Sequence, residues 1–90
     1  MTPEERKIYE DALDKWGVLD QLFMLFEEVS ELLNAVCKAR RGRVQKEDII
    51  TELADVQIML EQVTLIFDAE EEVVEEKKRK LERLKERLKK

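Results

Sequence analysis

The sequence predicts an all-α fold: a helical bundle of three long helices and a short N-terminal helix, completed by oligomerisation. Charged residues make up 43% of the 90 residues and hydrophobic residues another 43%, with only two glycines and one proline. A β-sandwich or barrel would need turn residues roughly every 8–12 positions, which this composition does not supply. One domain is expected, residues 1–90, and a chain of this size buries only about 60% of its unfolded surface, which favours self-association.

The first helix is expected to run from Pro3 to about Lys15. Thr2 and Glu5 have the spacing of a capping box, and Pro3 suits the first helical position. Gly17 marks the bend into the next helix.

The second and third helices are expected at residues 18–41 and 46–67, with a loop at 42–45. Gly42 is placed to end the second helix in the left-handed conformation that favours glycine. The expected core side of the second helix, which also carries Cys37, consists of Leu22, Leu25, Phe26, Val29, Leu32, Leu33 and Val36. A short connection predicts that the two helices are antiparallel neighbours. Together with Trp16 they form the motif region, residues 16–67.

A charged C-terminal helix is expected over residues 69–90, where blocks of glutamate alternate with lysine and arginine. Asp68 either caps this helix or lies within a bent continuation of the third helix. Leu81, Leu84 and Leu88 form a narrow apolar seam that suits packing against one neighbour.

Two pairs of carboxylates lie within the apolar helices. Residues three positions apart share a helix face, about 60° from each other, so Glu28 pairs with Glu31 and Glu52 with Asp55. The expected water-facing stripe of the third helix is Glu47, Gln57, Glu61 and Asp68. Glu52 and Asp55 lie away from that stripe, on an apolar face. Carboxylates in such a position must be paired, protonated or bound to a metal.

Antiparallel packing would collect the four carboxylates around one volume, where they repel unless cations intervene. Oxygen ligands without histidine favour Mg²⁺, or Mn²⁺ in its place, over zinc or non-haem iron, and the chain has no histidine. Protein-bound Mg²⁺ commonly also contacts substrate phosphates. Lys38 follows Glu31 by seven residues, which is about two helical turns, so it lies on the same face and is a candidate to bind those phosphates.

The segment EEVSE at residues 27–31, followed after 20 residues by ELAD at 52–55, resembles the signature of the MazG-like all-α nucleoside triphosphate pyrophosphohydrolases. The resemblance implies a helical bundle that works as a homodimer or homotetramer. It also implies Mg²⁺-dependent hydrolysis of an NTP or dNTP to the monophosphate and pyrophosphate, as in nucleotide pool house-cleaning. The implied metal ligands are Glu28, Glu31, Glu52 and Asp55, and Glu27 would add a ligand or orient the attacking water.

The same resemblance assigns further residues to the substrate. Lys80 and Arg83 match a K-x-x-R element that some members use near the phosphates. Trp16 and Met59 match positions that contact the base.

Two alternatives remain open from the sequence. One is a non-catalytic coiled-coil or bundle interaction module, in which the carboxylates are interhelical ion-pair partners. The other is a relative of phosphoribosyl-ATP pyrophosphohydrolase. Residues 1–68 carry 15 acidic and 8 basic side chains, so a nucleic-acid partner is not expected. The absence of a long apolar run predicts no membrane association and a cytoplasmic location.

Overall fold

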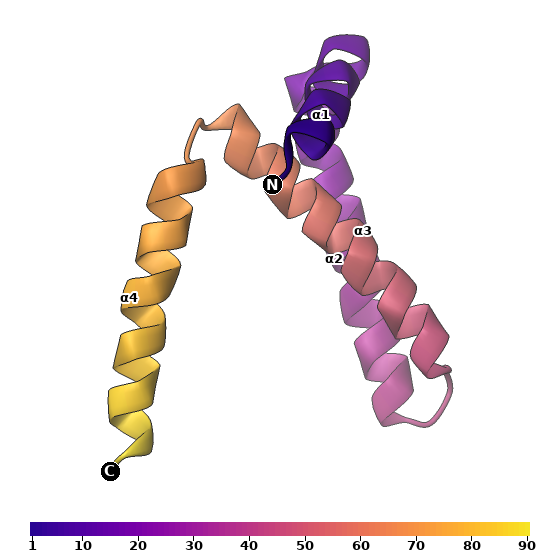
Figure 1. The fold of residues 1–90 in the computed structure, drawn as a ribbon. Coiled ribbons are helices and arrows are strands. Elements are labelled where there is room, and N and C mark those ends of the chain that lie inside the picture. The colour runs from indigo at the N-terminus through magenta and orange to yellow at the C-terminus, as the bar shows by residue number, and fades with distance from the viewer.

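A computed structural model describes all 90 residues, and its regular structure is entirely helical (Figure 1). The helices are α1 (Pro3–Trp16), α2 (Val18–Arg40), α3 (Lys46–Ile66) and α4 (Glu70–Leu88). The predicted all-α class is therefore confirmed, with helix ends within two residues of those expected. None of the four helices combines the length and the apolar character that crossing a membrane requires.

The turns around α1 follow the local signals in the sequence. The Oγ1 of Thr2 accepts a hydrogen bond from the Glu5 amide at 3.1 Å, and the Glu5 carboxylate accepts one from the Thr2 amide at 2.7 Å. This capping box satisfies amides that have no partner within the helix. Gly17 separates α1 from α2 with φ 89° and ψ 155°, a conformation that is essentially confined to glycine.

An antiparallel pair of helices, α2 and α3, forms the centre of the molecule, and α1 packs across one end of it (Figure 1). The side chains buried in the chain are Tyr9, Gln21, Ala35, Val56, Met59 and Gln62. The Tyr9 hydroxyl donates a hydrogen bond to Glu61 at 3.0 Å, and burial together with this bond raises the pKa of Tyr9 to about 12. Glu61 was expected in a water-facing stripe, which is wrong because α1 covers it.

The predicted core side of α2 is also partly wrong. Phe26, Leu33 and Val36 are at least half exposed, and Cys37 is exposed as well. Four of the predicted core residues are at least partly covered, because the buried and half-buried residues between positions 21 and 35 of α2 are Gln21, Leu22, Leu25, Glu28, Val29, Leu32 and Ala35. Helix α2 therefore leaves part of its apolar surface, including Phe26, Leu33 and Val36, uncovered within the chain.

Helix α4 is separate from α3 and extends away from the central pair (Figure 1). The last turn of α3 closes with hydrogen bonds from the Asp68 amide to the Leu65 carbonyl and from the Ala69 amide to the Thr64 carbonyl, both 3.0 Å. These bonds form a Schellman motif with Asp68 at φ 49°. Asp68 thus ends α3 rather than capping α4, whose N-cap is Ala69.

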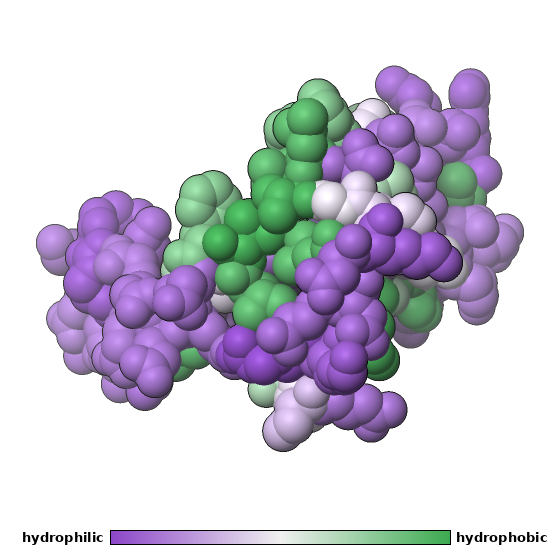
Figure 2. All heavy atoms as spheres, turned by 90° about the horizontal axis from the view of Figure 1, so that it is seen from above, coloured by the Kyte–Doolittle hydropathy of each residue, from purple (hydrophilic) through white to green (hydrophobic).

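The single chain does not close into a bundle. Its radius of gyration is 15.9 Å, whereas a compact domain of 90 residues has roughly 12 Å. Nineteen large hydrophobic side chains are exposed. Figure 2 shows hydrophobic residues gathered in a continuous area between hydrophilic regions. Continuous exposed apolar areas are uncommon on monomeric soluble proteins.

The two helix ends with positive φ allow a matched stability test. Gly42 ends α2 in the same motif as Asp68, at φ 71°, and a Cβ at Gly42 would meet nothing within 4 Å. Gly42→Ala therefore adds only left-handed backbone strain and is expected to lower the free energy of unfolding by about 1 kcal/mol. Asp68→Gly relieves the same strain and is expected to raise it by a few tenths of a kcal/mol. Urea denaturation measures both; changes of equal sign would contradict this account.

Candidate metal centre

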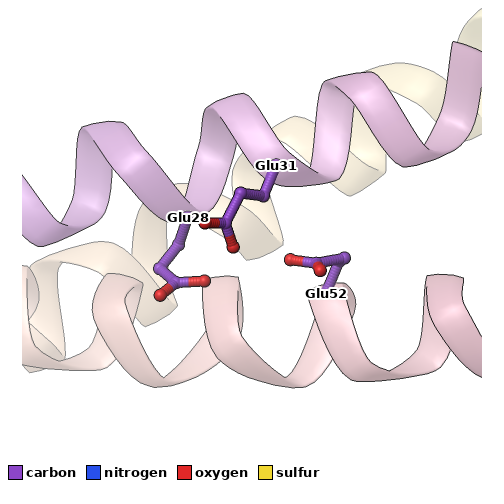
Figure 3. Close-up of side chains that lie close together, drawn as sticks. All are labelled: Glu28, Glu31 and Glu52. Atoms are coloured by element: carbon purple, nitrogen blue, oxygen red, sulfur yellow. The ribbon is translucent and has the colours of Figure 1, made fainter.

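Three carboxylates converge between the two central helices (Figure 3). Glu28 and Glu31 extend from α2, and Glu52 extends toward them from α3. Each offers one oxygen atom, and these three oxygens lie within 4.8 Å of one another. Because Mg²⁺ binds oxygen at about 2.0–2.1 Å, two oxygens on one ion lie at most about 4.2 Å apart, so the side chains would have to close slightly around a bound ion.

The acidic cluster formed by Glu28, Glu31 and Glu52 lacks the partners that would neutralise it. One oxygen of Glu28 and one of Glu52 are buried without a hydrogen-bond donor. None of the salt bridges in the structure involves a member of the cluster. The interaction-module alternative required interhelical ion pairs at these carboxylates, and the single chain contains none.

The environment favours the protonated form of two members. Burial, followed by the charges of Glu31 and Asp55, raises the pKa of Glu28 above its ordinary value. The same causes, in the same order, raise the pKa of Glu52, with a smaller contribution from Asp48. Like charges and desolvation both disfavour a second carboxylate anion. A bound divalent cation would reverse this balance by favouring the anions.

The other two acidic residues of the motif lie at the margin of the cluster. Asp55 is half-buried one helical turn after Glu52. Its charge acts on Glu28 and Glu52, but it does not belong to the set of three convergent oxygens. Glu27 is exposed and lines a different hollow from the one beside Glu31 and Glu52. The structure therefore collects three of the four predicted ligands and leaves Asp55 and Glu27 beside them.

A hollow of about 370 Å³ adjoins the cluster. It is lined by Glu31 and Glu52, by Asn34 and Lys38 from α2, and by Asp48 from α3. The structure thus brings Lys38 to the same hollow as two of the carboxylates. Asp48 was not expected here, although its position four residues before Glu52 is a signal that the sequence contains. Its carboxylate also accepts a hydrogen bond from the Gln45 amide at 3.1 Å, which caps α3.

A second hollow, of about 450 Å³, lies where α1 meets the start of α2. Its lining consists of Trp16, Asp20, Gln21, Phe23, Met24 and Glu27. Trp16 is 55% exposed, and the Lys15 ammonium lies over its ring at 5.2 Å from the centroid. Met59 is 5% exposed, lies between the helices and is not part of this lining. The structure therefore does not bring the two predicted base contacts together.

Lys80 and Arg83 lie on α4, which extends away from the helices that carry the cluster (Figure 1). They line a hollow on α4 together with Leu84 and Arg87. Within one chain these cations are not brought to the carboxylates.

The residues at the cluster fit a hard divalent cation. Their donors are carboxylate oxygens alone, and Glu28 and Glu52 each have one buried oxygen without a hydrogen-bond partner. Oxygen-only donor sets suit Mg²⁺ and Mn²⁺. Comparison of the chain with protein-family models, with curated proteins and with solved structures gave no match.

Proposed function

We propose that this protein is a Mg²⁺-dependent nucleoside triphosphate pyrophosphohydrolase. It would hydrolyse an NTP or dNTP to the monophosphate and pyrophosphate. The observation that carries the proposal is the convergence of Glu28, Glu31 and Glu52 in a partly buried volume without a cationic partner. The two motifs EEVSE and ELAD supply these carboxylates, and their spacing resembles that of the MazG-like enzymes.

In the proposed enzyme the carboxylates hold the cation, with Glu28, Glu31 and Glu52 as ligands and Asp55 as the fourth. The cation would neutralise charge on the bound phosphates and act as a Lewis acid. Lys38 lines the adjoining hollow, and its ammonium group would bind a phosphate there. It would offset the negative charge that develops on the departing pyrophosphate.

The reaction is a displacement by water at the α-phosphorus atom. A bond forms between the water oxygen and the α-phosphorus, and the bond from that phosphorus to the bridging oxygen breaks. Glu27 is exposed and therefore open to water, and it would orient the attacking molecule and accept its proton. The pyrophosphate leaves with the bridging oxygen. The base would enter the hollow that contains both Trp16 and Glu27 and would stack on the indole in place of the Lys15 ammonium.

Oligomerisation is part of the proposal. Exposed side chains such as Phe26 and Leu33 on α2, and Ile50 on α3, leave apolar surface that a second copy would cover. A homodimer or homotetramer would complete the bundle that one chain leaves open. Sedimentation at micromolar concentration tests this, and species of 10.7 kDa alone would contradict it.

A substrate screen tests the activity. All ribo- and deoxyribonucleoside triphosphates and phosphoribosyl-ATP would be incubated with the protein and Mg²⁺ or Mn²⁺, and the products identified. Release of pyrophosphate and a nucleoside monophosphate is expected from at least one triphosphate. Orthophosphate as product would indicate a different hydrolase, and cleavage of phosphoribosyl-ATP alone would favour the relative of phosphoribosyl-ATP pyrophosphohydrolase. No turnover by folded protein would favour the interaction module.

A further inference from the structure

The hollow of about 450 Å³ at the start of α2 contains a buried polar side chain without a partner. Gln21 lines this hollow and is only 7% exposed. Its backbone amide donates to the Gly17 carbonyl at 3.2 Å, whereas none of the hydrogen bonds in the structure uses its side chain. A buried polar group is normally hydrogen-bonded, because giving up its bonds to water is costly.

The carboxamide of Gln21 is open to the hollow. Three buried side-chain atoms are fully enclosed without a hydrogen-bond partner, and they belong to Glu28, Glu52 and Gln62. No atom of Gln21 is among them. A molecule in the hollow can therefore reach both the amide nitrogen, which donates hydrogen bonds, and the amide oxygen, which accepts them.

The other polar groups of the hollow make its lining rich in acceptors. They include the carboxylates of Asp20 and Glu27, neither of which takes part in a salt bridge. An ionised carboxylate only accepts hydrogen bonds. The donors are the amide nitrogen of Gln21 and the indole N–H of Trp16. A complementary ligand must therefore supply several donors of its own.

Apolar side chains complete the hollow and suit a planar ligand. Trp16 comes from α1, and Phe23 and Met24 come from α2. Aromatic rings stack on one another, and a thioether packs favourably against an aromatic ring. The lining thus fits a flat ring that has hydrogen-bond donors at one edge.

We propose that this hollow selects nucleobases that carry an amino group beside an acceptor ring nitrogen, as cytosine and adenine do. The amide oxygen of Gln21 would accept one amino hydrogen, and its amide nitrogen would donate to the ring nitrogen. The Asp20 carboxylate would accept the second amino hydrogen. This selection deepens the proposed function and rests on it for the identity of the ligand as a nucleotide.

A carbonyl oxygen replaces the amino group in uracil and in hypoxanthine. The amide of Gln21 can turn over and still pair with such a base, because it carries both a donor and an acceptor. The Asp20 carboxylate cannot adapt in this way. It would face the carbonyl oxygen with no hydrogen between the two acceptors, so Asp20 is the residue that discriminates.

The positions along α2 agree with this orientation of a nucleotide. Asp20 precedes Glu27 by seven residues, which places the two on the same face and about 10 Å apart along the helix axis. The base would lie at the end formed by Asp20 and Gln21. Glu27, which adjoins the acidic cluster in sequence, would lie at the end that receives the phosphates.

Two pairs of triphosphates isolate the contribution of the amino group. CTP and UTP differ at this group and the adjacent ring nitrogen, and so do ATP and ITP. We expect kcat/KM to be at least about tenfold higher for the amino member of any pair that is hydrolysed. A site built to bond an N–H group leaves its own polar groups unpaired when that group is missing. Equal values, or a preference for the carbonyl member, would overturn the proposal.

Replacing Asp20 by asparagine tests the residue that is assigned the discrimination. The asparagine amide can donate to a carbonyl oxygen, so the ratio of the two kcat/KM values should fall by about two- to tenfold. Asp14→Asn is the matched control, because it makes the same change at an exposed position of α1 outside the hollow. It should keep the ratio of the parent. An unchanged ratio in Asp20→Asn would overturn the role of Asp20.

The fluorescence of Trp16 tests the selection without hydrolysis. Trp16 is the only tryptophan of the chain, and it lines the hollow. CMP or AMP should quench this fluorescence at a concentration at least about tenfold lower than UMP or IMP. If the parent hydrolyses no triphosphate but shows this difference, only the proposed function fails. Equal quenching by all four nucleotides, or quenching by none, would show that the selection is wrong even if the protein releases pyrophosphate.

Discussion

Millimolar Mg²⁺ or Mn²⁺ is expected to raise the melting temperature of the protein by about 10 °C or more. A ligand that binds only the folded state adds about 2.7 kcal/mol at a hundredfold excess over its Kd. For a domain of 60–100 residues, each kcal/mol corresponds to roughly 4–8 °C. The effect is expected because Glu28, Glu31 and Glu52 present convergent oxygens and have no cation of their own. Differential scanning calorimetry with and without metal measures it.

Replacing Glu52 by glutamine should change both the stability of the metal-free protein and the gain in melting temperature with metal. Without metal, the variant should be at least as stable as the parent at neutral pH, because one of the mutually repelling charges is removed. With metal, most of the gain should disappear, because a ligand is lost. Glu47→Gln is the matched control: it makes the same change on the same helix, at an exposed position outside the cluster. It should respond to metal as the parent does.

The stability difference between Glu52→Gln and the metal-free parent should depend on pH. Burial, then the charges of Glu31 and Asp55, raises the pKa of Glu52 above the ordinary value of 4.5. The folded parent therefore holds this proton more tightly than the unfolded chain. That contribution to stability is complete below pH 4.5 and is lost as the pH rises through the folded pKa. The free energy of unfolding of Glu52→Gln, relative to that of the metal-free parent, should thus increase as the pH rises above 4.5.

Two results would contradict the metal centre. The first is an unchanged melting temperature of the parent at millimolar metal. The second is a Glu52→Gln variant that gains as much from metal as the parent does. Solvated surface glutamates would give both results, since they repel weakly in water and bind no cation tightly.

Much of the candidate site could be predicted from helical periodicity alone. Residues three apart share a face, and Glu28 and Glu52 interrupt faces that are otherwise apolar, so their convergence followed once α2 and α3 were antiparallel. Gly42 was predictable because the left-handed conformation at a helix end favours glycine. The shared face within each helix and the glycine at the end of α2 both follow from local backbone geometry.

Other features depend on tertiary contacts that periodicity does not specify. Helix α2 is apolar nearly all round, so the pattern could not show which side would pair with α3, and Phe26 was assigned to the wrong side. The helical pattern of α3 predicts that Glu61 is solvated, because the pattern does not show that Tyr9 of α1 contacts it. The break after α3 uses Asp68 in a conformation that an aspartate adopts only occasionally, which leaves no clear signal in the sequence.

Loss of one carboxylate of the cluster is expected to reduce pyrophosphate release by at least a hundredfold. Glu52→Gln removes a ligand, and the Lewis acid that it holds contributes several kcal/mol to the stabilisation of the transition state. Each 1.36 kcal/mol corresponds to a factor of ten in rate. The same Glu47→Gln control should keep the parent kcat, measured with the substrate found in the screen at saturating Mg²⁺.

Glu27→Gln separates metal binding from proton transfer, the two roles proposed for the carboxylates of the motif. Glu27 is exposed and outside the three convergent oxygens, so its replacement should leave the rise in melting temperature with metal intact. As the group that orients water and accepts its proton, it should nevertheless lower kcat by about 10²–10⁴. The loss should fall on kcat rather than on KM, because the proton moves only in the transition state. A Glu27→Gln variant with parent kcat would assign the proton transfer to another group, and one that no longer responds to metal would make Glu27 a ligand instead.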